Sequence, residues 1–405
     1  MTGPLADVRI LDLTRVLAGP TCTQLLGDFG ADVIKIERPG IGDDTRKWGP
    51  PYLKDAAGKE TSESAYYLSA NRNKRSVTID FAQPEGQALV KRLLEKCDLL
   101  VENFKGGTLK KYGLAFDQLQ PDFPALIYCS ISGFGQTGPY AHRAGYDYLA
   151  QAMGGLMSIT GEPEGEPVKV GIGIADIMAG MYATSAILAA LHRRTETGEG
   201  QSIDVGLLDS QVAWLTYEGQ NYLTSGQLPQ RRGNAHPNIV PYQTFAAADG
   251  YFVLAVGNDR QFQKFCGFAG CPELAEDPRY RTNSKRIENR QELARILSDV
   301  IAQKPIKYWT EGLEKLGVPS GPVNDIQGVF EDPQIRHRAM KIRMPHALRS
   351  DPPIDLIGNP VHLSGTPVSY RHPPPVLGQH TDEILADLLD MPEAEREALR
   401  EKGII

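Results

Sequence analysis

The stretch Val8-Arg-Ile-Leu-Asp-Leu13 is a short apolar run typical of a buried strand, and a second run, Val33-Ile-Lys-Ile-Glu37, follows it. The segment between them has Pro20 near its start and Gly30 just past its end. These two residues favour the beginning and the end of a helix. Two strands joined by a helix form a βαβ unit, which predicts an α/β fold with a mostly parallel sheet.

The same alternation continues to about residue 210. Further strands are expected at 76–81, 99–102, 125–130 and 201–205, and helices at 84–96, 175–194 and 207–223. The segment 175–194 is small and apolar nearly all round, so we expect it to be deeply buried. Beyond a polar connector at 225–238, an Asp249-Gly250 turn between two apolar runs predicts a hairpin and a second unit of α+β type. Helices are expected there at 285–302 and 306–315, and two short ones at 381–389 and 392–402.

Composition excludes several classes of protein. The chain has 405 residues, which suggests about two domains. It has no run of 18 apolar residues and no secretory signal, so no membrane span is expected. A net charge of −7 argues against nucleic-acid binding. The five scattered cysteines indicate a reducing, cytoplasmic environment.

Common catalytic motifs are absent from the sequence, which contains no P-loop, no HExxH, no GxSxG and no zinc-type Cys/His spacing. One GxGxxG pattern occurs, from Gly133 to Gly138. The residues after it, Pro139-Tyr-Ala-His-Arg-Ala-Gly145, are typical of a loop, whereas a dinucleotide site needs a helix there. We therefore interpret it as a glycine-rich turn near a ligand rather than as an NAD site.

A few charged and polar residues stand out as candidates for chemistry. Asp176 comes at the start of the apolar helix, where it can act as an N-cap or be held ionised as a nucleophile. Arg38 follows a strand, and it and the cluster of Arg72, Lys74 and Arg75 are candidate phosphate contacts or, alternatively, solvated surface charges. Asn103-Phe104 follows another strand, at the sheet edge where ligands bind.

Taken together and in this order, several motifs resemble the class III CoA-transferase family, which includes formyl-CoA transferases, carnitine CoA-transferases and acyl-CoA racemases. The matching motifs are Arg15-Val-Leu-Ala-Gly-Pro, Leu26-Gly-Asp-Phe-Gly-Ala-Asp-Val-Ile-Lys-Ile-Glu-Arg-Pro, Asn73-Lys-Arg-Ser, Val101-Glu-Asn-Phe, Gly133-Phe-Gly-Gln-Thr-Gly-Pro, Gly145-Tyr-Asp, Ala175-Asp and Leu377-Gly-Gln-His-Thr.

The resemblance implies an interlocked homodimer of ring-like subunits. It also implies a large Rossmann-like, CoA-binding domain from residues 1–200 and 325–405, a linker helix at 201–224, and a small α+β domain at 225–324.

The site residues are likewise implied by the resemblance. Asp176 aligns with the family's catalytic aspartate. Coenzyme A is the co-substrate, with no metal and no NAD. The CoA contacts fall on Val16, Leu17, Ala18, Arg38, Ile79, Asp80, Phe81, Ala82, Asn103, Phe104, Lys105, Lys111, Ser132, Gly133, Phe134 and Gly135. Lys111 and Ser132 stand where some members have a basic residue such as arginine.

For the acid substrate, the resemblance points to Tyr146, Asn234 and His236. The segments around Gly233-Asn-Ala-His-Pro-Asn and Pro319-Ser-Gly-Pro-Val-Asn look most like members that use succinyl-CoA and a dicarboxylate such as glutarate. Arg231, Arg232, Asn234 and His236 are either receptors for a distal carboxylate or ordinary polar loop residues.

The sequence leaves two alternatives to a transferase. One is a racemase of the same family. Racemases have a His where this chain has Tyr146, and a phenol, with an ordinary pKa of about 10, is a poor base for removing an α-proton. This difference favours a transferase over a racemase. An inactive CoA-binding homologue is the alternative of another class, and the presence of Asp176 argues against it.

Overall fold

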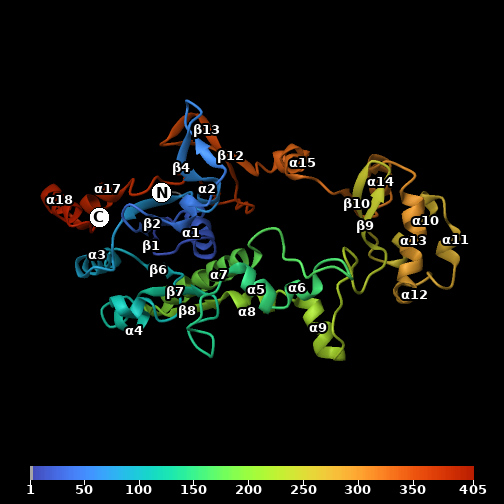
Figure 1. Cartoon of the computed structure of the whole chain (residues 1–405), viewed down its shortest axis with the longest axis horizontal. Coiled ribbons are helices and arrows are strands. Elements are labelled where there is room, and N and C mark those ends of the chain that lie inside the picture. The colour runs from blue at the N-terminus through green and yellow to red at the C-terminus, as the bar shows by residue number, and fades with distance from the viewer. Residues whose placement is uncertain (1–2) are drawn as a thin grey trace. The chain divides into compact units, whose positions relative to one another are not determined.

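The computed structural model describes residues 3–405, which fold into two compact units. The first unit comprises the chain up to Leu156, Val170–Leu215 and Pro333–Ile405, and the second comprises Met157–Lys169 and Thr216–Asp332. The first unit thus contains both the N-terminal and the C-terminal segments, which Figure 1 shows in blue and in red.

A six-stranded parallel sheet forms the centre of the first unit. Its order is β5 (Lys74–Thr78), β2 (Asp32–Glu37), β1 (Arg9–Asp12), β6 (Leu99–Glu102), β7 (Ile127–Ser132) and β8 (Ser202–Gly206). Every neighbouring pair is parallel. Counted along the chain, the order is 3-2-1-4-5-6, that of a Rossmann fold. The expected α/β class with a parallel sheet is therefore confirmed.

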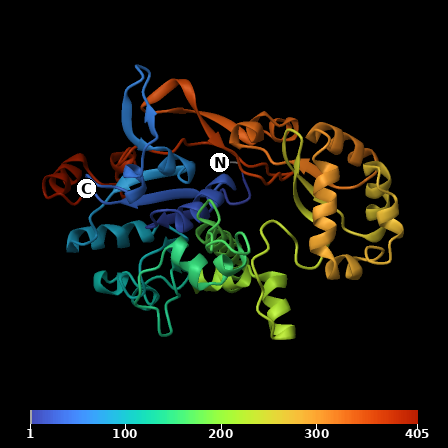
Figure 2. The same cartoon turned by 45° about the vertical axis from the view of Figure 1, so that its right-hand side comes forward.

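Helices cover both faces of this sheet and complete two apolar cores. On one face, α1 (Ala18–Asp28) and α7 (Ile174–Thr197) pack on residues such as Ile10 and Val101. On the other face, α3 (Pro84–Leu94) and α17 (Thr381–Leu389) pack on residues such as Leu11 and Leu100. The last helix, α18 (Glu393–Glu401), lies beside α17 in both Figure 1 and Figure 2.

Helix α7 is less deeply buried than expected. The side that carries Ala175, Ala179, Ala183 and Ile187 is buried, whereas Met181 on the other side is 50% exposed. The expectation was wrong because an apolar composition cannot tell whether one chain covers both sides of a helix. Helix α7 is also long enough and apolar enough to cross a membrane, but buried core helices meet the same criterion. Half of its most apolar 18-residue segment is buried within the structure.

Several elements of the first unit had no counterpart in the predictions. The hairpin β3 (Tyr52–Lys54) and β4 (Glu60–Ser64) lies near the hairpin β12 (Lys341–His346) and β13 (Arg349–Ile357) in Figure 2, and Leu53 packs with Met344, Ile354 and Leu356. The other short elements without a counterpart are η1 (Asp44–Lys47), α2 (Ala65–Ser69), η2 (Leu109–Tyr112), α4 (Phe116–Leu119), α5 (Asp147–Met153) and α16 (Pro333–His337). Helix α8 (Leu207–Ala213) also belongs to this unit and begins where a helix was expected. Helix α6 (Leu156–Ile159) begins at the last residue of this segment and otherwise belongs to the second unit.

The second unit is α+β. The expected hairpin is present as β9 (Tyr242–Ala247) and β10 (Gly250–Ala255), joined at its edge by β11 (Ser320–Pro322). The helices of this unit are α9 (Thr216–Ser225), α10 (Asp259–Ala269), α11 (Glu273–Glu276), α12 (Asn283–Glu288), α13 (Arg290–Ile301), α14 (Ile306–Lys315) and α15 (Ile326–Glu331).

One helix prediction was wrong in its extent. The single helix expected at 207–223 is two helices, α8 and α9, because the backbone turns between them and Thr216 has a φ of 43°.

Candidate active site

The candidate site lies where the strand order of the sheet reverses, between β1 and β6. Ligands of open α/β sheets bind at this point, beyond the carboxyl ends of the strands. The loops that follow the two strands are tied together there. The Arg15 N–H donates to Asn103 Oδ1 at 2.9 Å, and Asn103 Nδ2 donates to the Arg15 carbonyl at 2.6 Å.

A cavity of about 110 Å³ opens at these loops and contains Asp176. It brings together many of the residues predicted from the sequence: Val16, Leu17, Ala18, Asn103, Phe104, Lys105, Ser132, Gly133, Tyr146 and Asp176. It also contains residues that were not predicted as site residues: Arg15, Ile131, Arg143, Ala144, Gly145 and Leu207. Arg15 and Gly145 lie within two of the motifs that resemble the family, so those motifs could have identified them as site residues.

Asp176 lies in the first turn of α7, but it is not the helix N-cap. The cap is Gly173, and the carboxylate that meets the helix N-terminus is Asp147, the first residue of α5. Asp147 Oδ1 accepts from the N–H of Ala175 at 2.7 Å and from that of Asp176 at 3.4 Å. The N-cap interpretation of Asp176 was therefore wrong.

The charge state of Asp176 also differs from the expectation. Burial, and then the negative charge of Asp147, raise the pKa of Asp176 to about 7. The helix N-terminus was expected to hold this carboxylate ionised. Instead, Asp176 is poised between its acid and its carboxylate near neutral pH, as is common for groups that take part in chemistry.

A second cavity, of about 340 Å³, lies on the other side of Arg15 and Phe104, which line both cavities. The predicted residues Arg38, Ile79, Asp80, Phe81 and Ala82 line it. Its aromatic side is built from edge-on ring contacts of Phe81 with Phe104 and with Tyr112, with centroids 5.9 and 5.6 Å apart.

The other predicted residues lie outside the linings of these two cavities. Lys111 is exposed on η2, and Phe134 and Gly135 lie in the loop after β7. Asn234 and His236 belong to the second unit. Asn234 is exposed there, and the imidazole of His236 lies near the rings of Tyr217 and Tyr242.

Several cations that were candidates for ligand binding have protein partners. Arg231 donates to the carbonyls of Glu162, Pro163 and Gly165, and Arg232 pairs with Glu218 at 3.3 Å.

The same holds for the cluster on and before β5. Arg72 pairs with Asp28, Lys74 with Asp12, and Arg75 with Asp32 and Glu383. The prediction that Arg72, Lys74 and Arg75 contact phosphate was therefore wrong. They are not solvated surface charges either, because their side chains are only 5%, 0% and 14% exposed.

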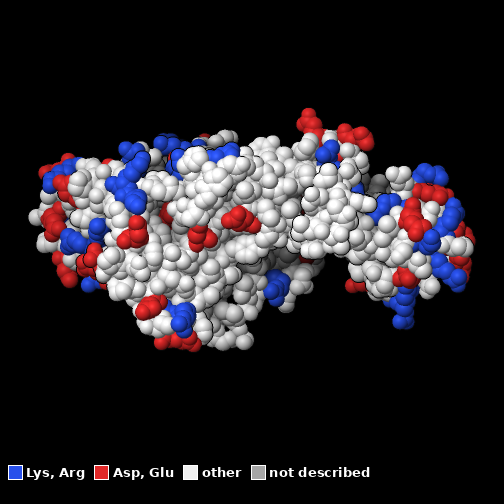
Figure 3. Space-filling model, turned by 90° about the horizontal axis from the view of Figure 1, so that it is seen from below, with Lys and Arg blue, Asp and Glu red and all other residues white. Residues whose placement is uncertain are grey.

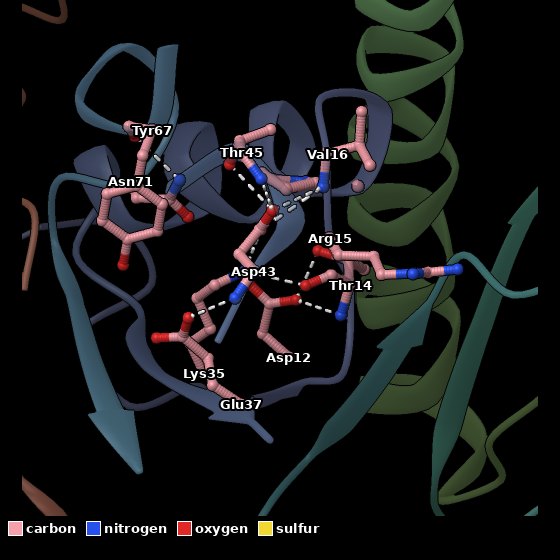
Figure 4. Close-up of polar contacts among 12 residues, drawn as sticks. Asp12, Thr14, Arg15, Val16, Lys35, Glu37, Asp43, Thr45, Tyr67 and Asn71 are labelled. Carbon is pink, nitrogen blue, oxygen red and sulfur yellow. Dashed lines mark hydrogen bonds and ion pairs between the residues drawn. The ribbon is translucent and has the colours of Figure 1, made fainter. Parts of the chain in front are cut away.

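The turn between β1 and α1 contains a strained residue. Val16, a β-branched residue, has a φ of 71°, a region that costs about 1–3 kcal/mol for such a side chain. Figure 4 shows the carboxylate of Asp43 next to this turn, where it accepts from the Val16 N–H at 3.2 Å and from Thr45. Lys35 completes the arrangement, because its ammonium donates to Asp43 at 2.9 Å and to the Thr14 carbonyl at 2.8 Å.

The Gly133–Gly138 loop lacks the geometry of a dinucleotide site. The chain after β7 forms no helix until α5 begins at Asp147. Gly133 instead packs against the backbone of Gly145, where an added Cβ would lie 2.5 Å from the Gly145 Cα. This contact holds the 143–147 loop against the end of β7.

Comparison with known proteins gives one consistent result. Residues 5–381 match the model of CoA-transferase family III. A succinate–glutarate CoA-transferase of Agrobacterium fabrum is 48% identical, over 95% of this chain and 96% of that protein. A succinyl-CoA:glutarate CoA-transferase of Mus musculus is 46% identical, over 99% of this chain and 90% of that protein. The crystal structure of a CaiB/BaiF family protein from Brucella suis, 46% identical, superposes with a TM-score of 0.85 over 96% of this chain and all of that one.

Proposed function

Because the chain belongs to CoA-transferase family III, we propose that it moves CoA from succinyl-CoA to a free dicarboxylate such as glutarate. The names of relatives at 46–48% identity support these substrates. The observation that carries the proposal is the carboxylate of Asp176, buried in a cavity at the ligand-binding edge of the sheet, with a pKa raised to about 7.

The two cavities suit the two ends of an acyl-CoA. The nucleotide end goes to the larger cavity, where Arg38 offers a positive charge and Phe81 offers an aromatic surface. The thioester end goes to the smaller cavity beside Asp176. Arg15 and Phe104, which line both, would lie along the connecting arm of CoA.

The proposed chemistry starts from ionised Asp176. The carboxylate attacks the thioester carbonyl carbon, the C–S bond breaks, and CoA leaves as a thiolate with formation of an aspartyl–succinyl mixed anhydride. The thiolate then attacks the aspartyl carbonyl, which gives an aspartyl–CoA thioester and releases succinate.

The second half runs in reverse with the acceptor acid. Its carboxylate attacks the aspartyl–CoA thioester and displaces the CoA thiolate, and the thiolate attacks the acceptor carbonyl of the new anhydride, which frees Asp176. No proton is gained or lost overall. A carboxylate with a pKa of about 7 is a stronger nucleophile than an ordinary one and is still about half ionised at neutral pH.

The experiment is replacement of Asp176 combined with trapping. Asp176→Asn keeps the shape of the side chain but cannot form the anhydride, so we expect loss of transfer with an unchanged fold. Wild-type protein incubated with succinyl-CoA and then with hydroxylamine should be modified on the peptide that contains Asp176. Asp117→Asn, which alters an exposed carboxylate, serves as the control. Substantial activity in Asp176→Asn, or a label on another residue, would refute the proposal.

A further inference from the structure

A dicarboxylate substrate brings a second negative charge that takes no part in the transfer. When one end of succinate or glutarate is bound at Asp176, the other end is placed elsewhere in or beside the same cavity. A carboxylate removed from water needs a cation and hydrogen bonds to replace its hydration. The cavity of Asp176 must therefore supply a free cation if the proposed substrates are correct.

Three cations line this cavity: Arg15, Lys105 and Arg143. Arg15 is paired with Asp44 at 2.6 Å and also lines the larger cavity. Among the described residues, neither Lys105 nor Arg143 forms an ion pair. The two arginines that the sequence suggested for this task, Arg231 and Arg232, are already engaged by carbonyls and by Glu218.

Aromatic rings, and not a carboxylate, hold the guanidinium of Arg143 in place. Its guanidinium lies over the rings of Tyr140 and Phe134, 4.7 and 5.2 Å from their centroids. Ring stacking orients a guanidinium but leaves its N–H donors available for a planar, two-oxygen acceptor. A carboxylate has that geometry.

The loop of Arg143 is also the loop that reaches Asp176. Gly145 packs on Gly133 at the end of β7, and Asp147 binds the N–H groups of Ala175 and Asp176. No ion pair joins Arg143 to Asp176 itself. The cation and the nucleophile are thus two separate groups at one cavity.

A second observation indicates that this cavity takes a ligand oxygen. Ser132, the last residue of β7, lines the cavity and is 5% exposed, and its hydroxyl has no hydrogen-bond partner among residues 3–405. Buried hydroxyls in native proteins are normally paired. A substrate oxygen in the cavity would complete its hydrogen bonding.

We propose that Arg143 binds the remote carboxylate of the dicarboxylate substrates and so selects them over monocarboxylates. This inference rests on the proposed function, since it assigns a residue to the acid end of the same substrates. Lys105, on the loop after β6, then contacts the CoA moiety instead.

The test compares Arg143→Gln with wild type on two acceptors of equal chain length, glutarate and pentanoate. We expect kcat/KM for glutarate to fall about 10-fold or more, as for loss of a charge-assisted hydrogen bond, and kcat/KM for pentanoate to change little. Arg143→Lys, which keeps the charge but not the two-pronged geometry, should lie between the two. Lys304→Gln removes another cation stacked on a ring, over Tyr308, and should leave both values unchanged.

Inhibition by desulfo-CoA distinguishes binding of the remote carboxylate by Arg143 from binding of the CoA phosphates by Arg143. Desulfo-CoA carries all the phosphates of CoA and no acyl group. Its inhibition constant should be the same for wild type and Arg143→Gln. A rise in that constant, or equal losses on glutarate and pentanoate, would overturn the assignment. Failure of wild type to transfer CoA to any dicarboxylate would instead refute the proposed function.

Discussion

Two carboxylates with different tasks meet at the start of α7. Asp147 fixes the backbone by accepting from Ala175, and its charge is one of the two causes that raise the pKa of Asp176 to about 7. Asp147→Asn keeps an acceptor oxygen for the helix but removes the charge. The pKa of Asp176 should then fall. The acid limb of kcat/KM against pH, which we expect near pH 7 in wild type, should therefore move to lower pH. An unchanged limb, with Asp117→Asn as control, would contradict this role.

The raised pKa of Asp176 also makes a prediction for stability. In the unfolded chain this carboxyl has its ordinary value of 3.8, so the folded state binds the proton more tightly. The resulting stabilisation is present below about pH 4 and is lost as the pH rises through about 7, a change on the order of 4 kcal/mol. Asp176→Asn does not ionise, so its gain in melting temperature over wild type should be larger at pH 8 than at pH 5. Equal differences at both pH values would contradict the raised pKa.

At the scale of elements, the turn from β1 to α1 is held by a buried ion pair rather than by its own sequence preference. Lys35 and Asp43 are both fully buried, and burial alone would raise the pKa of Asp43. The charge of Lys35 and the hydrogen bonds from Thr45 outweigh that effect and lower it. This pair therefore maintains the strained conformation of Val16 at the edge of the site.

Asp43→Asn tests the pair, because it leaves the charge of Lys35 buried without its partner. Breaking a buried pair in this way costs about 3–5 kcal/mol of unfolding free energy, measured by urea denaturation. The neighbouring Asp44→Asn breaks only the exposed pair with Arg15, which is worth about 0.2–1 kcal/mol. Equal losses in the two variants would show that the Lys35–Asp43 pair does not hold the turn.

The elements that the sequence predicted well are those determined by local pattern. The strands and helices of the sheet appear within a few residues of their expected positions, because alternation and helix ends are local signals. Features that depend on distant partners were missed or misassigned. Asp147 accepts from N–H groups in the first turn of α7, 28 and 29 residues away, and Arg72 and Arg75 bind Asp28 and Asp32 across more than 40 residues. Half of the predicted site residues line the cavity of Asp176, because strand-end loops converge in a parallel sheet.

At the scale of the whole molecule, one apolar surface is not covered by any part of the chain that the structure describes. Helices α5, α7 and α8 pack on one another, and all three expose large apolar side chains, among them Tyr148, Met181, Tyr182, Leu188 and Val212. The middle of the view in Figure 3, where these helices lie, shows few charged side chains. Extended exposed apolar surfaces of this kind mark sites of association. A second copy of the chain is the cover that the family resemblance implies.

We therefore predict a homodimer whose subunits are interlocked and do not exchange without unfolding. Mixing donor- and acceptor-labelled protein should give no energy transfer under native conditions over hours, and full transfer after joint unfolding in urea and refolding. Sedimentation at nanomolar concentration should show a dimer. Met181→Glu should lower the yield of dimer, because it buries a charge in the interface, whereas Glu196→Gln, near the polar end of the same helix, should not. A folded monomer at nanomolar concentration would refute the dimer. Rapid exchange of subunits between folded dimers would refute the interlocking alone, because two rings that only touch can separate, whereas two rings that pass through each other cannot.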